Sequence, residues 1–199
     1  MLIGLTGKSC AGKNHVAALL EARGLPVLDV DKLGYQALEM EKEKIFSIFG
    51  SDLQRADGSL NRRLLGQRVF GNPEKLAALE AVIHPPVNQL TEKWITERDG
   101  ACVINAALLH RSVIFNRLDR IILVTAPLFT RLIRAKRRDK LSWKVVFNRF
   151  ASQKDFYSQY LSANAEIYRV FNFGSFGAQK KLERRIDLFL EGIVKWKKK

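Results

Sequence analysis

Residues 7–14 place two glycines and two lysines between a predicted strand and a predicted helix. They read Gly-Lys-Ser-Cys-Ala-Gly-Lys-Asn and follow the short apolar stretch Leu2–Thr6. Residues 15–22 then carry apolar side chains at helical spacing, and Gly24 ends that pattern. In a phosphate-binding loop, glycines let backbone amides turn towards phosphate oxygens, a lysine adds positive charge, and the following helix points its positive end at the ligand. The alternative is an ordinary turn, but the strand before and the helix after favour a nucleotide site.

The last position of this loop departs from the usual pattern. Asn14 stands where G-x-x-x-x-G-K-[ST] has a hydroxyl residue, which normally holds Mg²⁺. An asparagine offers the metal a neutral carbonyl oxygen, which is also a hard ligand. We therefore predict an Mg²⁺ site with Asn14 as its protein ligand. Lys8 is a second candidate source of the charge that a metal usually provides.

Four more candidate strands follow along the chain. Strands 1, 3 and 4 are continuous apolar stretches, which is typical of strands buried on both faces of a parallel sheet. Because helical patterns separate the strands, we predict an α/β phosphate-loop fold with a mostly parallel five-stranded sheet flanked by helices. The later strands are expected at Pro26–Val30, Ala101–Leu109, Arg120–Ala126 and Arg169–Phe173, and a final helix at Gln179–Lys197.

A long helical insertion separates the second and third strands. Its expected breaks are Asp57-Gly58, Asn72-Pro73 and His84-Pro85-Pro86. Ligands of such sheets bind beyond the carboxyl ends of the strands, where the loop and the start of the insertion converge. The expected organisation is a core made of residues 1–31, 99–130 and 159–199, an insertion of residues 32–98, and an arginine-rich lid of residues 131–158.

Composition limits the class of protein. The 199 residues suffice for one substantial core with an inserted segment. The net charge of +14, from 34 Lys and Arg against 20 Asp and Glu, indicates an anionic partner. Cys10 and Cys102 form neither a disulfide framework nor a zinc motif, no leader is recognisable, and no apolar stretch approaches the roughly 20 residues of a membrane span. We expect a cytoplasmic chain, and we interpret the basic residues 195–199 as a solvated tail.

Two acidic residues end the second strand. If the extended backbone persists, Asp29 and Asp31 project to the same side, towards the mouth of the cleft. A carboxylate there can accept a proton from an attacking hydroxyl or hold Mg²⁺ through water. The alternative is that one of the two caps the next helix.

Basic residues cluster after the fourth strand, within residues 131–140. They form either a solvated helix face or a mobile lid whose arginines reach the transferring phosphates and exclude water. Aromatic residues follow among basic ones, a pattern that single-stranded nucleic-acid binders also show. These aromatics are Phe147, Phe150, Phe156, Tyr157 and Tyr160.

The motif that is most specific lies in the insertion. Residues 56–66 read Ala-Asp-Gly-Ser-Leu-Asn-Arg-Arg-Leu-Leu-Gly, and residues 69–74 and 79–85 continue the pattern A-D-G-x-L-x-R-R-x-L … I/V-F-x-[DN]-P … H-P. Four further matches keep their order: Ile3–Gly7, Val27–Asp31 for V-I-D-A-D, Arg138-Asp139 with Leu141-Ser142 for R-D-x-[LV]-[ST], and Asn172–Gly174 for N-x-G. On these residues the chain resembles the dephospho-coenzyme A kinase family from end to end.

The resemblance implies transfer of the ATP γ-phosphoryl group to the ribose 3′-hydroxyl of dephospho-CoA. Asp31 would be the general base, and Lys13 with the loop amides would hold the phosphates. Arg138 and Arg149 would belong to the lid, and Asn172 would lie near adenine. The implied catalytic residues are Asp31, Lys13 and Arg138; the ATP-binding residues are Gly7, Lys8, Ser9, Cys10, Ala11, Gly12, Lys13, Asn14, His15, Arg149 and Asn172; the acceptor-binding residues are Asp31, Arg62, Arg63 and His84.

The chain also departs from the family pattern. Residues 8–11 replace a glycine-rich middle, His15 replaces the usual Thr, and residues 105–111 match D-x-P-L-L-F-E only in part. The alternative function is therefore a catalytically weakened phosphate-loop protein that binds nucleotide or nucleic acid. As a kinase, the chain is expected to be a monomer with ATP and dephospho-CoA as partners and with no membrane or nucleic-acid partner.

Overall fold

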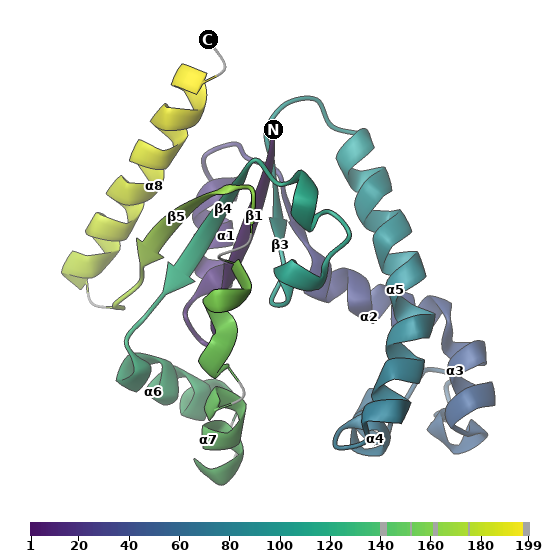
Figure 1. Ribbon diagram of the computed structural model, residues 1–199. Helices are drawn as coiled ribbons and strands as arrows, with labels where there is room; N and C mark the ends of the chain where they lie inside the picture. Colours follow the sequence, from purple (N-terminus) through teal and green to yellow (C-terminus); the bar gives the residue numbers. More distant parts are fainter. Residues whose placement is uncertain (140–142, 152, 161–162, 175, 197–199) are drawn as a thin grey trace. The chain divides into compact units, whose positions relative to one another are not determined.

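The computed structural model describes residues 1–139, 143–151, 153–160, 163–174 and 176–196 (Figure 1). The chain divides into two compact units. The first contains Met1–Leu28 and Gly100–Lys199, and the second contains Asp29–Asp99. Within the described ranges, no helix combines the length and the apolar character that a membrane crossing requires.

The first unit is built on a five-stranded sheet with the order β2-β3-β1-β4-β5. Strand β1 pairs in parallel with β3 and β4, and β4 pairs in parallel with β5. All residues of β1 and β3 are buried, which explains their continuous apolar sequences. The predicted parallel sheet is confirmed. The strands are β1 (Leu2–Gly7), β2 (Val27–Asp29), β3 (Cys102–Asn105), β4 (Arg120–Thr125) and β5 (Glu166–Phe171).

Helices α1 (Lys13–Glu21) and α8 (Phe176–Trp196) share the main core with this sheet. Val16 and Leu20 of α1 and Ile186 and Phe189 of α8 pack there with residues of β1 and β4. Helices α6 (Leu128–Asp139) and α7 (Trp143–Ala151) follow β4, beyond the carboxyl ends of β4 and β5 (Figure 1). Short 3₁₀ turns span Leu109–Arg111, Phe115–Arg117, Lys154–Phe156 and Ser158–Tyr160.

The second unit is helical. It consists of α2 (Val30–Met40), α3 (Lys42–Phe49), α4 (Arg62–Val69) and α5 (Pro73–Thr96), with a 3₁₀ turn at Ser51–Leu53. One apolar face of each helix α3, α4 and α5 contributes to a separate core, because their large side chains recur at helical spacing. The buried members of that core are Ile45, Phe46, Phe49, Leu53, Leu60, Leu65 and Val69.

Two strands differ from their predicted bounds by more than one residue at an end, and the other three by one residue at most. The third strand ends at Asn105 and not at Leu109, although the apolar sequence continues. Leu109 is apolar because it packs on the sheet: a Cβ on Gly4 would lie 2.5 Å from its Cδ2 atom. The fifth strand is Glu166–Phe171, whereas the sequence predicts Arg169–Phe173. It lies at the edge of the sheet with most of its residues partly or fully exposed, so its start carries little apolar signal.

The predicted break at His84-Pro85-Pro86 is wrong, because α5 runs through all three residues. Neither proline has an amide hydrogen to donate to the carbonyl one turn earlier, which weakens the helix locally. Packing of neighbouring side chains against the core of the second unit, with Pro86 itself buried, offsets that loss. The break at Asn72-Pro73 is confirmed: Asn72 Oδ1 accepts a hydrogen bond from the Lys75 amide at 3.0 Å, and Pro73 is the first helical residue.

Candidate active site

The loop between β1 and α1 has the backbone shape that its glycines predict. Gly12, at the N-cap of α1, has φ 95°, and Cys10 has φ 61°. Cys10 is the one non-glycine with a positive φ among the described residues, and such backbone strain is concentrated at functional sites. Glycine is also needed for space, because a Cβ on Gly7 would lie 2.5 Å from the Val124 carbonyl oxygen.

The carbonyl groups of this loop are all engaged by the protein. The carbonyl oxygens of residues 8 and 12 accept hydrogen bonds from backbone amides, and those of residues 9–11 accept them from side chains. Arg134 of α6 donates from Nη1 to the Cys10 and Ala11 carbonyls at 3.3 Å each. Asn172, which follows β5, donates from Nδ2 to the Ala11 carbonyl at 3.1 Å. A loop whose carbonyls are tied back in this way can turn its amides towards an anion.

Asn172 itself is buried, and it is one of the side chains that hold the loop carbonyls in place. Its Oδ1 accepts a hydrogen bond from Arg134 Nη2 at 3.1 Å, and its backbone amide donates to the Thr125 carbonyl at 2.8 Å. The side chain that the resemblance places near adenine therefore contacts the phosphate loop directly. A contact with adenine stays a prediction.

The remaining candidate ATP-site residues lie on three helices and on the loop. Lys13 is the first residue of α1 and His15 follows in its first turn, while Arg138 is exposed near the end of α6 and Arg149 is half-buried on α7. The ammonium group of Lys8 lies 4.5 Å from the ring centre of Tyr157. Burial of Lys8, and then the positive charge of Arg131, lower the pKa of this lysine. Leu141 and Ser142 of the lid motif and the tail residues 197–199 lie outside the described residues.

The candidate metal ligand has a second asparagine beside it. Asn14 is exposed in the first turn of α1, and its Oδ1 accepts a hydrogen bond from Asn105 Nδ2 at 3.3 Å. Asn105 is 1% exposed, and its Oδ1 has no hydrogen-bond partner among the described residues. Mg²⁺ binds hard oxygens and usually takes only one or two protein ligands beside phosphates and waters, so this pair fits the ion. Both side chains are neutral, so the pair would add no charge to such a site.

In the second unit, the two acidic residues do not project from one extended strand as predicted. Asp29 caps α2: its Oδ1 accepts hydrogen bonds from the amides of Asp31 and Lys32 at 3.1 and 3.3 Å. Asp31 lies in the first turn of α2 and is exposed. The helix starts at Val30, so the alternative that one carboxylate is a cap is confirmed for Asp29. This leaves Asp31 as the candidate base.

One turn after Asp31, α2 carries Tyr35, which the sequence analysis missed. Residues four apart share a helix face, so Asp31 and Tyr35 lie on the same side of α2. The Arg62 guanidinium carbon lies 5.1 Å from the Tyr35 ring centre. The structure thus brings Arg62, in the first turn of α4, to the helix of Asp31. Arg63 of α4 and His84 of α5 are exposed on the same unit. An exposed aromatic residue at i+4 from the base was the available sequence signal.

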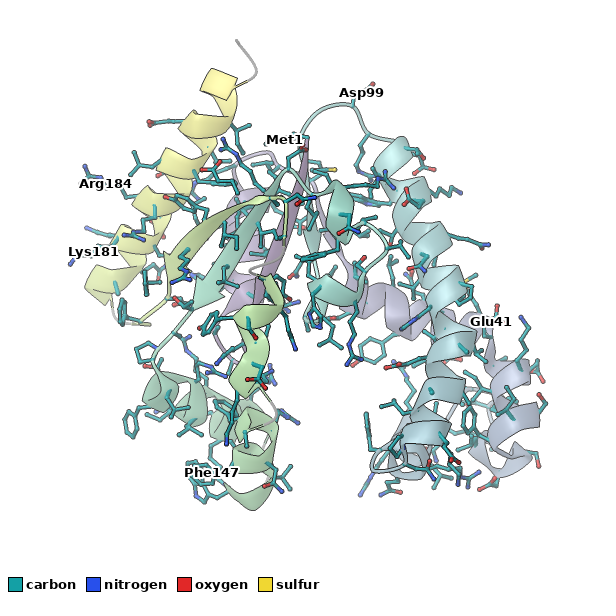
Figure 2. The ribbon with its side chains drawn as sticks, viewed as in Figure 1. Met1, Glu41, Asp99, Phe147, Lys181 and Arg184 are labelled. Atoms are coloured by element: carbon teal, nitrogen blue, oxygen red, sulfur yellow. The ribbon has the colours of Figure 1, made fainter. Side chains whose placement is uncertain are left out.

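The aromatic residues that follow the basic cluster of residues 131–140 do not form a single exposed surface. Phe156 is 4% and Tyr160 1% exposed, and Phe150 lies under the Arg131 guanidinium at 4.4 Å. Phe147 is exposed on α7, as Figure 2 shows. Stacking of successive bases requires exposed ring faces along one groove. The pattern that suggested nucleic-acid binding is therefore mostly core packing.

Tyr160 instead joins the base of the loop to the segment after β3. Its hydroxyl lies 3.2 Å from Thr6 Oγ1 and 3.3 Å from His110 Nδ1. Burial raises the pKa of Tyr160, although its hydrogen bond with Thr6 opposes this, and burial lowers the pKa of His110. Both shifts favour neutral side chains in this network.

Comparisons with known proteins agree with the geometry. The family model described as dephospho-CoA kinase matches residues 1–169, which include all candidate residues except Asn172. The dephospho-CoA kinase of Treponema pallidum is 34% identical over 200 residues, covering 95% of this chain and 93% of that protein. A crystal structure from Thermus thermophilus is 34% identical with a TM-score of 0.81 and covers 97% of both chains. A dephospho-CoA kinase structure from Campylobacter jejuni, 22% identical with a TM-score of 0.64, covers 96% of each chain and supports the fold. The chain belongs to the dephospho-CoA kinase family.

Proposed function

We propose that this protein transfers the γ-phosphoryl group of ATP to the ribose 3′-hydroxyl of dephospho-CoA and releases coenzyme A and ADP. The observation that carries the proposal is the family match, which spans the phosphate loop and the whole second unit in one continuous region. The alternative of a weakened nucleotide or nucleic-acid binder is not favoured, because the relatives are kinases over nearly the full chain.

At the ATP end, the loop amides and Lys13 bind the phosphates. The support for this assignment is the loop itself, because its carbonyls are tied back by Arg134 and Asn172. Gly12 at its end is the N-cap of α1, and the positive end of a helix favours an anion. We assign Arg138 and Arg149 to a lid of residues 131–158 that contacts the transferring phosphate. Mg²⁺, when bound at Asn14, would neutralise part of the phosphate charge.

At the acceptor end, Asp31 takes the proton of the 3′-hydroxyl. Asp29 supports this role indirectly, since capping α2 fixes the first turn on which Asp31 lies. Arg62, Arg63 and His84 bind the acceptor, whose phosphates match the planar forks of arginine. Tyr35 orients Arg62 through their ring contact.

The chemistry is a direct in-line displacement. A bond forms between the 3′-oxygen and the γ-phosphorus while the bond from that phosphorus to the β–γ bridging oxygen breaks, so ADP leaves with the bond electrons. The 3′-hydroxyl proton passes to Asp31. The transition state of such a transfer is loose, and the protein contributes mainly by positioning the two substrates and by stabilising charge.

We further propose that the core comprises residues 1–31, 99–130 and 159–199, that residues 32–98 form the acceptor domain, and that the protein acts as a cytoplasmic monomer. The division of the chain near residues 28 and 100 supports the domain assignment. Among the described residues, neither Cys10 nor Cys102 forms a disulfide, which is typical of a reducing compartment.

The experiment is to follow ADP release with dephospho-CoA as the only acceptor. We expect acceptor-dependent turnover by the wild-type chain and its loss in Asp31→Asn and Lys13→Ala. Matched controls are Asp99→Asn and Lys181→Ala, which change exposed side chains at the end of the second unit and on α8 (Figure 2). Absence of acceptor-dependent turnover in the wild type would refute the proposal.

A further inference from the structure

The backbone of Ser9, in the middle of the phosphate loop, is bonded at its amide and at its carbonyl by two side chains, those of Gln153, which precedes the 3₁₀ turn Lys154–Phe156, and of Arg131 on α6. Its amide donates to Gln153 Oε1 at 3.0 Å, and its carbonyl accepts a hydrogen bond from Arg131 Nε at 2.8 Å. Arg131 Nη2 donates to the same Gln153 Oε1 at 3.1 Å. One side-chain oxygen therefore receives two donors, a loop amide and a guanidinium.

Arg131 is a charged side chain in an unusual environment. It is 6% exposed, its guanidinium lies on the Phe150 ring, and its hydrogen-bond acceptors are uncharged oxygens. Within the described part of the chain, no carboxylate forms an ion pair with it. Burial lowers the pKa of this arginine. A buried charge is costly unless it is paired, so an anion delivered to this position would relieve an unfavourable arrangement.

A phosphate oxygen is the acceptor that suits these two donors. Backbone amides of a loop before a helix and the planar fork of arginine are the groups that bind phosphate in proteins, and their bonds to an anionic oxygen are stronger than those to a neutral amide. Lys8 adds a second positive charge beside Arg131: the charge of Arg131 lowers the pKa of Lys8, and the charge of Asp155 opposes this. The Gln153 oxygen occupies the place where such an anion would accept both bonds.

We propose that the Ser9 amide and Arg131 Nη2 form an oxyanion site for one phosphate of the nucleoside triphosphate, and that Gln153 Oε1 fills this site in the ligand-free chain. The inference rests on the proposed assignment of the loop to the ATP phosphates. Binding of the triphosphate exchanges a neutral acceptor for a charged one at the same donors. Gln153 is then a competitor of the ligand, and Arg131 is a binding residue.

These roles predict opposite effects of two substitutions. Methionine at position 153 keeps the length of the side chain but has no oxygen that competes with a phosphate. In the ligand-free chain, Arg131 Nη2 then loses the acceptor that Gln153 Oε1 provides. Gln153→Met should tighten binding by about threefold to tenfold, the size of one ordinary hydrogen bond. Arg131→Met removes a charged donor and should weaken binding by about tenfold to a hundredfold.

The experiment measures binding of ATP and of inorganic tripolyphosphate to the full chain by calorimetry in EDTA, so that no metal contributes. Gln159→Met and Arg184→Met are the matched controls, because both residues are exposed in the first unit; neither should change affinity by more than about twofold. Thermal unfolding confirms that each variant is folded. If Arg131→Met does not fold, Arg131→Lys replaces it, because it keeps the charge but loses the fork and should still weaken binding.

If Gln153→Met weakens binding of ATP and tripolyphosphate, the proposal is overturned. Gln153 would then support the loop and would not compete with the ligand. Unchanged affinity in the position 131 variant would also overturn the proposal, while leaving the loop assignment intact. If the wild-type chain binds neither ATP nor tripolyphosphate, both the loop assignment and this inference fail.

Discussion

Gly12 and Asn172 lie so close together that a Cβ atom on Gly12 would come within 2.0 Å of Asn172 Nδ2. The two residues belong to opposite ends of the sequence, yet the side chain of Asn172 fills the space that a glycine leaves beside the loop. The glycine of the phosphate loop is thus required for packing as well as for its φ of 95°.

This contact predicts a large effect of Gly12→Ala. The positive φ alone costs about 1–2 kcal/mol for an alanine, and the clash with Asn172 adds to it. Gly24→Ala is the control, because Gly24 has φ 83° with nothing within 4 Å of its added Cβ. Chemical denaturation should show a greater loss of stability for Gly12→Ala than for Gly24→Ala, and Asn172→Ala should recover part of the difference. Equal losses at the two glycines would contradict the packing argument.

Asp29 and Asp31 should separate into a structural and a catalytic residue. Asp29→Ala removes the cap of α2 and should lower the free energy of unfolding by about 1 kcal/mol, whereas Asp29→Asn keeps a good cap and should be nearly neutral. Asp31→Asn should leave stability unchanged and reduce kcat by about 10²- to 10⁴-fold, the usual contribution of a general base. Denaturation curves and steady-state kinetics on the three variants test this. A stable but inactive Asp29→Asn would reverse the assignment.

Substitution of Tyr35 should change KM for the acceptor and leave KM for ATP unchanged. Tyr35→Leu removes the ring that lies against Arg62 and should raise KM for dephospho-CoA by about two- to fivefold, the value of an exposed cation–π contact. Tyr35→Phe retains the ring and serves as the conservative control. Both variants should leave KM for ATP unchanged. Equal increases in the two KM values for Tyr35→Leu would mean that the contact with Arg62 is not specific to the acceptor.

The asparagine pair predicts how metal binding responds to charge. Asn105→Asp adds a carboxylate beside Asn14 and should tighten Mn²⁺ binding to the complex with a non-hydrolysable ATP analogue, measured by electron paramagnetic resonance. Asn14→Ser and Asn14→Thr restore a hydroxyl and should keep or raise Mg²⁺-dependent activity. Loss of activity in both hydroxyl variants would instead show that the site has adjusted around the asparagine.

Protonation of His110 should lower the free energy of unfolding at acidic pH. Burial, and then the charge of Arg111, lower the pKa of His110 in the folded chain, so the unfolded chain binds this proton more tightly. Stability should therefore fall as pH drops below about 6.5, the pKa of an unperturbed histidine, and should be unaffected by His110 well above it. His110→Asn should flatten the pH dependence of the melting temperature between about pH 7 and 5. An unchanged slope would refute the prediction.

Several parts of the candidate site were readable from local sequence. The order of apolar strand, glycine loop and helix identified residues 7–14, and the continuous apolar stretches identified the strands of a parallel sheet, because both signals depend on neighbours along the chain. Asp29 and Asp31 show where this reasoning fails. An aspartate at a strand end is equally suited to an extended and to a capping position, and only the hydrogen bonds of the folded chain decide between them.

The sequence by itself determined the class of fold, the position of the phosphate loop and the family motif of the insertion. Tertiary structure alone decided which distant side chains complete the loop. Asn172 bonds to Ala11 across 161 positions, and Gln153 bonds to Ser9 across 144. Periodicity and spacing report on contacts within one helix or strand. Contacts between residues so far apart depend on how β1, α6, α7 and β5 pack, which no local pattern encodes.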